Sequence, residues 1–557
     1  MKKVLKLTIF TLFIILIFTI NLLAMPPHPD YLKKLASEGQ LNKIISKMNI
    51  QKKMGIDNSV KTFPLTSAKA KVLVLLIGYR DMKFNEATSA NNFIIPFIKR
   101  KIRIPFDGLP VFIFSLLFVF SLFLTNKRKK KKILILASSM LLLFSLTACP
   151  NPVEIDYFDT PTTKFYDNLF ETGQYSFKQY YLDMSNGALN LEFDVVGPFA
   201  APQGYAYYGG NDTNGNDLHP AELVGVAIDK AEKAGVDFSQ YDNDHDGNVD
   251  VVIVIHAGPG EEITGGYDIT DVIWSHRWNL SSAQSQGDGT GERHYDGVTI
   301  DDYTIQPEYN SQPGDSTIGV FCHEFGHILG LPDLYDYQYE ASGVGLFSLM
   351  DFGSYGGPGF DGSRPVPLTA WERSRLGWVT FEEVSYGSEL PNYEIFKSLS
   401  NNRNALKVQL EGDSEINQYL FLEYLYQEDG TWTEYLPGSG LLVLRIDQNL
   451  VDDGVNSIDS YNFNDFKSLH HGVEVVEADN QWELWDASLK DGTNLGEAED
   501  LYTTTADGIL SPSTNPNTNY YSGPGQYGHT PTLVSGIIVD IKQINVGTSI
   551  KVSIRKQ

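Results

Sequence analysis

The sequence has only two cysteines, Cys149 and Cys322, among its 557 residues. Two cysteines exclude a disulfide framework and a metal site built from several thiolates. Basic residues are also scarce in most of the chain: residues 151–557 hold 19 Lys and Arg against 63 Asp and Glu, whereas residues 1–150 hold 24 against 6. A body with a net charge of −44 repels phosphate groups, so we expect no nucleic-acid partner. The same acidity suits an extracellular protein that binds Ca²⁺, although a salt-adapted surface has a similar composition.

The amino-terminal region predicts export from the cytoplasm. Lys2 and Lys3 precede an apolar run from about Leu7 to Leu23, and the chain becomes polar at Met25, which is typical of a signal peptide over residues 1–24. An uncleaved membrane anchor is the alternative, because the run is near the upper length for a signal. Both interpretations predict an extracytoplasmic protein, either secreted or anchored to the outer face of a bacterial cell membrane.

Two further apolar runs, residues 109–124 and 133–148, flank the basic block Lys127–Lys132. Such a block between two apolar runs is typical of a membrane hairpin with a cytoplasmic turn, which would associate the protein with the membrane. The second run ends in Leu-Thr-Ala-Cys149, which resembles a bacterial lipoprotein signal. The joining of two reading frames is a third explanation of the interrupting segment 98–152, and the sequence leaves all three open.

The rest of the chain predicts an α+β fold. A strand is expected over Lys71–Ile77, a helix over Asp217–Gly235 and a buried strand over Val249–Ile255. Beyond about residue 380, short alternating runs separated by Gly, Pro, Asn and Asp indicate a β-rich domain over residues 381–557, for which we expect a β-sandwich.

The most specific pattern is His323-Glu324-Phe325-Gly326-His327. Residues four apart lie on one face of a helix, so His323 and His327 can present two imidazole nitrogens to one zinc ion. Glu324 then lies beside the metal and can accept a proton from its bound water. Gly330 and Pro332 end the helix and return the chain, so that Asp333 can supply the third ligand. The alternative third ligand is Glu372, on an expected helix over residues 368–376.

An acidic loop predicts a calcium site. Asp242, Asp244, Asp246 and Asp250 occupy positions 1, 3, 5 and 9 of an EF-hand-like spacing, and Asn248 can offer its carbonyl oxygen. Position 12 is Ile253, so the bidentate glutamate of a complete EF-hand is missing. A solvated turn before a strand is the simpler alternative.

The segment HEFGHILGLPDLYD resembles the active-site signature of the M6 (immune inhibitor A-like) metallopeptidases. The stretches MPPHPDYLKKLASEG, YDNDHDGNVDVVIVIHAGPGEE, VIWSHRW, SLMDFGSYGG and LTAWERSRLGW support the resemblance. It implies a zincin-type catalytic domain with a mixed sheet over residues 71–97 and 153–380, which residues 98–152 interrupt. It also implies a propeptide-like segment over residues 25–70.

The same resemblance implies roles for single residues. His323, His327 and Asp333 would bind zinc, and Glu324 would act as general base in the hydrolysis of extracellular proteins or peptides. Met350 resembles the methionine turn beneath the metal of metzincin-like peptidases, and the hydroxyl of Tyr355 could stabilise the developing oxyanion. Other residues in the similar stretches, His256 and Glu308, are expected to make core or loop-bracing hydrogen bonds, and Cys322 is expected to be a small buried residue.

A function of another class fits the same composition. A catalytically silent, Ca²⁺-braced surface adhesin would use its β-rich domain to bind a ligand. The presence of Glu324 with both histidines argues against it, because a silent homologue need not keep them. The sequence therefore favours a zinc-dependent endopeptidase.

Overall fold

The computed structural model describes residues 23–29, 69–85, 160–213, 215–262, 271–336, 342–400, 403–412, 416–452, 471–484, 494–521 and 531–557. The expected signal peptide up to residue 22, most of the propeptide-like segment and the whole interrupting segment 98–152 lie outside these residues. Among the helices of the described ranges, none combines the length and the apolar character needed to cross a membrane.

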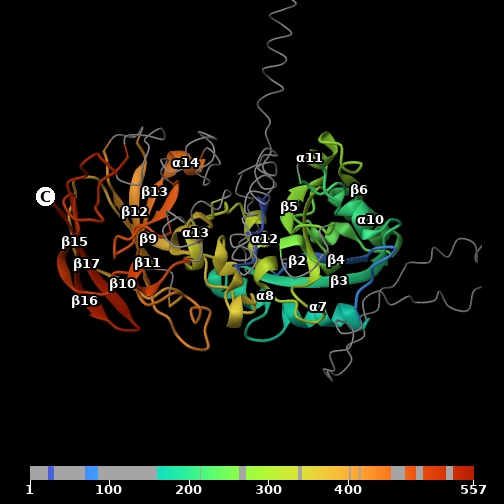
Figure 1. The fold of residues 1–557 in the computed structure, drawn as a ribbon, viewed down its shortest axis with the longest axis horizontal. Coiled ribbons are helices and arrows are strands. Elements are labelled where there is room, and N and C mark those ends of the chain that lie inside the picture. The colour runs from blue at the N-terminus through green and yellow to red at the C-terminus, as the bar shows by residue number, and fades with distance from the viewer. Residues whose placement is uncertain are drawn as a thin grey trace, which may run out of the picture. The chain divides into compact units, whose positions relative to one another are not determined.

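A six-stranded mixed sheet carries the amino-terminal part of the fold, in the order β1-β5-β8-β4-β2-β3 (Figure 1). Its strands are β1 (Leu23–Ala24), β2 (Lys69–Gly78), β3 (Asn190–Ala200), β4 (Val252–Pro259), β5 (His276–Asn279) and β8 (Asp302–Tyr309). Strands β3, β2, β4 and β8 run parallel, whereas β5 is antiparallel to β8 and β1 is antiparallel to β5. The strand expected over Lys71–Ile77 is confirmed within β2, and the one expected from Val249 begins three residues later.

Helices cover both faces of this sheet. Helices α7, α8 and α12 share one hydrophobic core with alternate residues of β2 such as Val72 and Val74, while α10 packs against β2 and β3. The helices of this region are α7 (Pro161–Glu171), α8 (Phe177–Met184), α9 (Tyr205–Tyr208), α10 (Pro220–Lys233), α11 (Leu280–Ser285), α12 (Gly319–Ile328) and α13 (Ala370–Arg375). A two-stranded ribbon, β6 (Arg293–Tyr295) and β7 (Val298–Ile300), completes it.

The predicted start of the helix at Asp217 is wrong by three residues. Helix α10 begins at Pro220, whose fixed φ suits the first helical position. Asp217 instead accepts a hydrogen bond from the backbone N–H of Trp274, at 2.9 Å, and so ties the approach to the helix to another segment. The helix ends at Lys233, two residues before the predicted end, and Gly235 follows the C-cap residue Ala234 with a φ of +88°.

The carboxy-terminal part contains two antiparallel-rich sheets and little helix. A five-stranded sheet has the order β14-β13-β12-β11-β9, and a four-stranded sheet has the order β10-β17-β16-β15. The bounds are β9 (Thr380–Val384), β10 (Leu390–Phe396), β11 (Arg403–Gln409), β12 (Gln418–Leu425), β13 (Gly440–Asp447), α14 (Gln448–Asp452), β14 (Val473–Val475), β15 (Ala506–Leu510), β16 (Ile537–Asn545) and β17 (Ser549–Lys556). Residues of both sheets, such as Leu422 and Val552, belong to one hydrophobic core.

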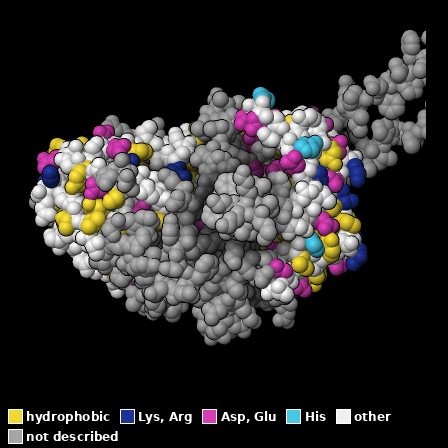
Figure 2. Space-filling view, turned by 90° about the horizontal axis from the view of Figure 1, so that it is seen from above, with side chains coloured by type: hydrophobic (Ala, Val, Ile, Leu, Met, Phe, Trp, Pro, Cys, Tyr) yellow, Lys and Arg dark blue, Asp and Glu magenta, His cyan; other side chains and the backbone are white. Residues whose placement is uncertain are grey.

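A buried ion pair joins the five-stranded sheet to α13. Glu423 of β12 accepts hydrogen bonds from the Arg373 guanidinium and from the backbone N–H of Ala370, both at 2.7 Å. Both charged side chains are almost fully buried, so the loss of either partner alone would leave an uncompensated charge in the interior. Acidic side chains are spread over the described surface on the face drawn in Figure 2, in keeping with the net charge.

Candidate active site

Helix α12 is buried along its whole length, which fixes the direction of its polar side chains. Phe321 and Phe325 pack against the aromatic residues of α7 and α8, with centroid distances of 5.0 Å from Phe321 to Phe170 and from Phe325 to Tyr181. Cys322 is fully buried, as expected, and its carbonyl oxygen accepts a hydrogen bond from the Tyr181 hydroxyl. The aromatic face therefore anchors the helix and leaves the opposite face for the histidines.

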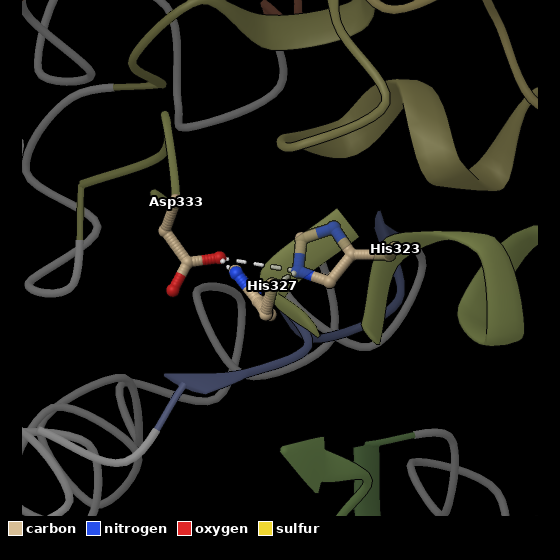
Figure 3. A group of neighbouring side chains, drawn as sticks. All are labelled: His323, His327 and Asp333. Atoms are coloured by element: carbon tan, nitrogen blue, oxygen red, sulfur yellow. Dashed lines mark hydrogen bonds and ion pairs between the residues drawn. The ribbon is translucent and has the colours of Figure 1, made fainter. Parts of the chain in front are cut away.

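The turn after α12 brings the third side chain to the two histidines. Gly330 adopts a φ of +88°, and the N–H of Leu331 bonds to the carbonyl oxygen of Gly326 at 3.0 Å. The chain then reverses, so that Oδ1 of Asp333 lies 3.1 Å from Nε2 of His323 and 3.2 Å from Nε2 of His327 (Figure 3). The two Nε2 atoms lie 3.1 Å apart. The predicted return of the chain towards His327 is confirmed.

The hydrogen bonds of the two histidines indicate which ring nitrogen can bind a cation. Nδ1 of His323 lies 3.0 Å from the carbonyl oxygen of Leu349, and Nδ1 of His327 lies 2.9 Å from that of Leu331. A carbonyl oxygen only accepts, so each Nδ1 carries a proton, and the neutral form of either ring has its lone pair on Nε2. Two Nε2 atoms and a carboxylate oxygen thus converge on one buried point, and these three side chains could hold a metal ion.

The charge states agree with this arrangement. Burial alone would raise the pKa of Asp333, but the adjacent His327 and His323 lower it to about 2, so this carboxyl is ionised at neutral pH. Burial lowers the pKa of His327 below its ordinary value, which favours the neutral ring that can bind a metal.

Glu324 lies beside this group and is fully buried. Burial, followed by the charges of Asp333 and Glu262, raises its pKa well above the ordinary value, against the smaller opposing effect of the Met25 backbone. Among the described residues, none donates a hydrogen bond to either carboxylate oxygen of Glu324. A carboxyl group with a raised pKa takes up a proton readily once it is ionised, and this is the property that a general base needs.

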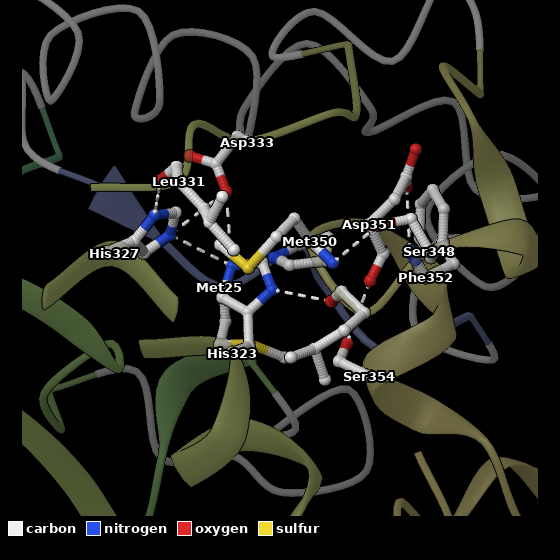
Figure 4. A network of polar contacts seen from close by, with 12 residues as sticks. Met25, His323, His327, Leu331, Asp333, Ser348, Met350, Asp351, Phe352 and Ser354 are labelled. Carbon is white, nitrogen blue, oxygen red and sulfur yellow. Dashed lines mark hydrogen bonds and ion pairs between the residues drawn. The ribbon is translucent and has the colours of Figure 1, made fainter. Parts of the chain in front are cut away.

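The segment from residue 23 to residue 29 runs through the site, which no sequence signal indicated. Strand β1 pairs with β5, and the indole N–H of Trp274 donates to the carbonyl oxygen of Met25 at 2.9 Å. The Tyr355 hydroxyl donates to the carbonyl oxygen of Pro26 at 2.7 Å, and the N–H of His28 donates to that of Glu262 at 3.1 Å. Met25 belongs to the network drawn around the histidines in Figure 4.

A tight turn that contains Met350 and Asp351 packs against α12 next to the histidines. Met350 packs against α12 so closely that a Cβ added at Gly326 would lie 2.4 Å from its sulfur. Asp351 holds the turn, because its carboxylate accepts hydrogen bonds from the N–H groups of Val344, Gly345 and Phe352, each at 2.7 Å. Asp351 and Phe352 lie beside Met350 in Figure 4. The sequence pattern indicates Met350 but not Asp351, because the role of Asp351 depends on backbone N–H groups that residue spacing does not reveal.

The structure does not bring Glu372 to the histidines. Its buried carboxylate accepts hydrogen bonds from Thr369, through N–H at 2.6 Å and Oγ1 at 2.8 Å, and from the Ser348 hydroxyl at 2.8 Å. It thereby caps α13 and braces the turn that precedes Met350. Burial raises its pKa to about 7. The geometry favours Asp333 over Glu372 as third ligand.

The acidic loop is only partly assembled as expected. Carboxylate oxygens of Asp242, Asp244 and Asp246 lie within 4.8 Å of one another. Asp250 is not in this group, because its Oδ2 accepts hydrogen bonds from the backbone and side-chain N–H groups of Asn243, at 2.9 and 2.7 Å. The N–H of Asn248 donates to Asp246 at 2.8 Å, which stabilises the turn.

The other two residues singled out by the sequence have structural contacts. Glu308 accepts hydrogen bonds from the N–H groups of Asn85 at 2.6 Å and Gly258 at 3.0 Å, so its expected role in bracing a loop is confirmed. His256 is fully buried beside Tyr79, with its Nδ1 3.2 Å from the carbonyl oxygen of Ala257, and burial lowers its pKa to about 4.

The candidate site lies in a part of the chain that is similar to known proteins. Residues 157–379 match the family model of the immune inhibitor A peptidase M6 catalytic domain, which confirms the resemblance over that range. A pre-pro-metalloprotease PrtV of Vibrio cholerae is 33% identical over 267 residues, 42% of this chain and 28% of that protein. An immune inhibitor A of Bacillus thuringiensis subsp. alesti is 33% identical over 239 residues, 38% of this chain and 34% of that protein. The matches thus span about a third of the length of these curated relatives.

Proposed function

We propose that this chain is a zinc-dependent endopeptidase that acts on extracellular proteins or peptides. His323, His327 and Asp333 would bind the zinc ion, and Glu324 would be the general base. The observation that carries the proposal is the convergence of two Nε2 lone pairs and one carboxylate oxygen beside a buried glutamate. These residues lie within the range that matches a metallopeptidase catalytic domain.

The chemistry follows from the properties of these side chains. A bound zinc ion would supply a Lewis acid and a water molecule of lowered pKa. Glu324 takes a proton from the attacking water and then delivers it to the nitrogen of the leaving amine. Tyr355 donates its hydroxyl proton as a hydrogen bond to the carbonyl oxygen on which negative charge develops. Its hydrogen bond to the carbonyl oxygen of Pro26 supports this assignment, because it shows that the Tyr355 hydroxyl can donate to a peptide carbonyl oxygen at this position.

The contacts of strand β1 suggest how a substrate would be bound. An extended peptide can add to β5 as an antiparallel strand, with main-chain hydrogen bonds that do not depend on its sequence. Residues 25–29, which follow the expected signal peptide, make such main-chain contacts, since the N–H of Met25 donates to the carbonyl oxygen of Ser275 at 3.3 Å, and they also approach Glu324 and Tyr355. We therefore infer that this segment blocks the substrate groove and that residues 25–70 act as a propeptide that keeps the enzyme latent.

The remaining assignments belong to the same proposal. The catalytic domain has the zincin type of fold, and the two carboxy-terminal sheets form a β-sandwich around their shared core. The acidic loop binds a structural Ca²⁺ ion through Asp242, Asp244 and Asp246. The chain is extracytoplasmic, with residues 1–24 as its export signal, and the relatives named as metalloprotease and immune inhibitor A favour this function over a silent adhesin.

Hydrolysis and metal content together test the proposal. The full chain is activated by limited proteolysis of its amino-terminal region and is assayed on an unfolded protein substrate, beside Glu324→Gln. We expect one zinc ion per chain in both proteins, with hydrolysis lower in the variant by a factor of about 10² to 10⁴. Equal activity of the variant would exclude Glu324 as base. Zinc-free wild-type protein, or ligand binding without hydrolysis, would contradict the peptidase assignment.

A further inference from the structure

A second group of carboxylates lies in the carboxy-terminal part of the chain. One carboxylate oxygen from each of Glu477, Asp479, Glu483 and Asp500 lies within 4.8 Å of the others. Glu477, Glu483 and Asp500 are each at most 2% exposed, so these are not solvated surface acids. Such a concentration of buried negative charge is costly unless protons or a cation neutralise it.

The backbone brings these residues together from two segments. The Glu477 carboxylate accepts hydrogen bonds from the N–H groups of Glu483 at 2.9 Å and Leu484 at 3.0 Å, which closes the loop around it. The N–H of Ala478 donates to the carbonyl oxygen of Asp500 at 3.0 Å, so the second segment lies directly beside the first. The group is therefore a consequence of a defined chain path.

The two carboxylate oxygens of Asp500 have different surroundings. Its Oδ2 accepts a hydrogen bond from the N–H of Glu497 at 2.8 Å. Its Oδ1 is buried and has no hydrogen-bond partner in the part of the chain that the structure describes. A buried carboxylate oxygen without a partner is unfavourable, and a metal ion is a common reason for it.

The proton affinities support the same conclusion. Burial, and then the charge of Asp500, raises the pKa of Glu477 to about 8. Burial and the neighbouring carboxylates Asp479, Glu497 and Glu483 raise the pKa of Asp500 to about 7. The raised pKa values reflect the same crowding of buried negative charge as the short distances between these carboxylates.

We propose that Glu477, Asp479, Glu483 and Asp500 bind a Ca²⁺ ion. All four ligands are hard carboxylate oxygens, which suit Ca²⁺ better than they suit zinc. Ligands of one Ca²⁺ ion lie about 2.3–2.6 Å from it, so the mutual distances within 4.8 Å are compatible with a shared ion. The site is separate from the histidine centre and from the Asp242–Asp246 loop, and it does not depend on peptidase activity.

The ion would stabilise a loop that supports the active-site turn. The N–H of Ser342 donates to the carbonyl oxygen of Leu484 at 2.9 Å, and the N–H of Leu346 donates to that of Leu495 at 2.7 Å. Residues 342–347 lead directly into the turn that contains Met350. Calcium bound between residues 477 and 500 would therefore stabilise the segment around Leu484 and Leu495, to which residues 342–347 are hydrogen-bonded.

Calcium stoichiometry and thermal stability of the full chain test the proposal. Wild type is compared with the double variant Glu477→Gln/Asp500→Asn and with Asp244→Asn/Asp246→Asn, which changes only the other acidic loop. After chelation and dialysis against Ca²⁺, the first variant should bind one ion fewer per chain than wild type. Ca²⁺ in hundredfold excess over its dissociation constant should raise the Tm of wild type by roughly 5–10 °C more than that of the first variant.

The chelated proteins show whether the variant simply fails to fold. Without Ca²⁺ the two amides remove charge repulsion, but Glu477→Gln also replaces one of the two oxygens that accept the N–H groups of Glu483 and Leu484. The Tm deficit of the variant relative to wild type should therefore be clearly smaller in chelator than in Ca²⁺. An equal deficit in both conditions would mean that the carboxylates serve the fold directly, and it would overturn the proposal. An unchanged Ca²⁺ stoichiometry in this variant would also overturn it.

Discussion

The hydroxyl of Tyr355 donates a hydrogen bond to the main-chain carbonyl oxygen of Pro26, 2.7 Å away and 329 residues earlier in the chain. The ring of His28 packs edge-on against the same tyrosine, with the centroids 5.1 Å apart. A residue proposed to stabilise the oxyanion is thus already bound to a peptide carbonyl of the chain itself. The same hydrogen bond would therefore be made by a bound substrate and by the segment that keeps the enzyme latent, so the two should compete for it.

A peptide with the sequence of residues 24–29, AMPPHP, should inhibit the activated enzyme competitively. It can add to β5 and accept the hydrogen bond of Tyr355, as the chain does. In Tyr355→Phe the inhibition constant should rise by about five- to tenfold, since one hydrogen bond contributes about 1 kcal/mol. Steady-state inhibition kinetics measure both effects. A scrambled peptide of the same composition is the control, and equal inhibition by both peptides would contradict the proposed binding mode.

Substitution of the two candidate third ligands should separate zinc binding from support of the turn. Asp333→Ala should lose zinc and activity, because a catalytic site needs three fixed protein ligands. Glu372→Ala should keep its zinc but unfold more easily, by about 1–3 kcal/mol, because Thr369 and Ser348 lose their buried acceptor. Metal analysis and thermal unfolding of both variants measure the difference. Zinc retained in Asp333→Ala and lost in Glu372→Ala would reverse the assignment.

The sequence predicts those parts of the site that depend on local spacing. His323, Glu324, His327 and Asp333 lie within eleven positions, and the helix period with Gly330 suffices to bring them together. The acidic loop is local too, yet Asp250 turned towards Asn243, because a nearby amide competes with any metal for its oxygen.

Contacts between distant segments could not be predicted in this way. The carbonyl oxygen of Met25 meets Trp274 across 249 positions, and a main-chain hydrogen bond leaves no residue pattern. The carboxylates of Glu477 and Asp500 resemble any other acids in an acidic sequence, and only their shared burial distinguishes them. For the sheets, alternation of apolar residues indicated β structure after residue 380, but the pairing order depends on long-range register.

Removal of Ca²⁺ from the Asp242–Asp246 loop should lower the stability of the catalytic domain. Asp242, Asp244 and Asp246 would then repel one another. The chain continues from this loop into β4, and the N–H of Val249 ties it to β7 through the carbonyl oxygen of Thr299. Thermal unfolding in a Ca²⁺-selective chelator should give a lower Tm than in Ca²⁺. Comparison with Glu477→Gln/Asp500→Asn isolates this loop, since that variant retains only this site. A chelator-independent Tm in that variant would exclude calcium from the loop.

The β16–β17 pair should stabilise the carboxy-terminal sheets in a pH-dependent manner. Burial alone would raise the pKa of Asp540, but hydrogen bonds from Arg555, the Gly508 N–H and Lys542 lower it to about 2. The folded state therefore favours the ionised form, and the resulting stability is complete above the unfolded pKa of about 4. It is lost as the pH falls from about 4 to about 2.

Asp540→Asn should accordingly lower the free energy of unfolding at pH 6 by about 1 kcal/mol, a value reduced for solvent screening because the Arg555 side chain is 45% exposed. The difference from wild type should shrink as the pH is lowered towards 3, which denaturant unfolding at several pH values can measure. Glu428→Gln is a matched control, because its ion pair with Lys397 lies at the surface, with the two side chains 45% and 26% exposed, and should contribute little at any pH. A deficit of Asp540→Asn that grows at low pH would mean that the Asp540 carboxylate does not stabilise the fold through its charge.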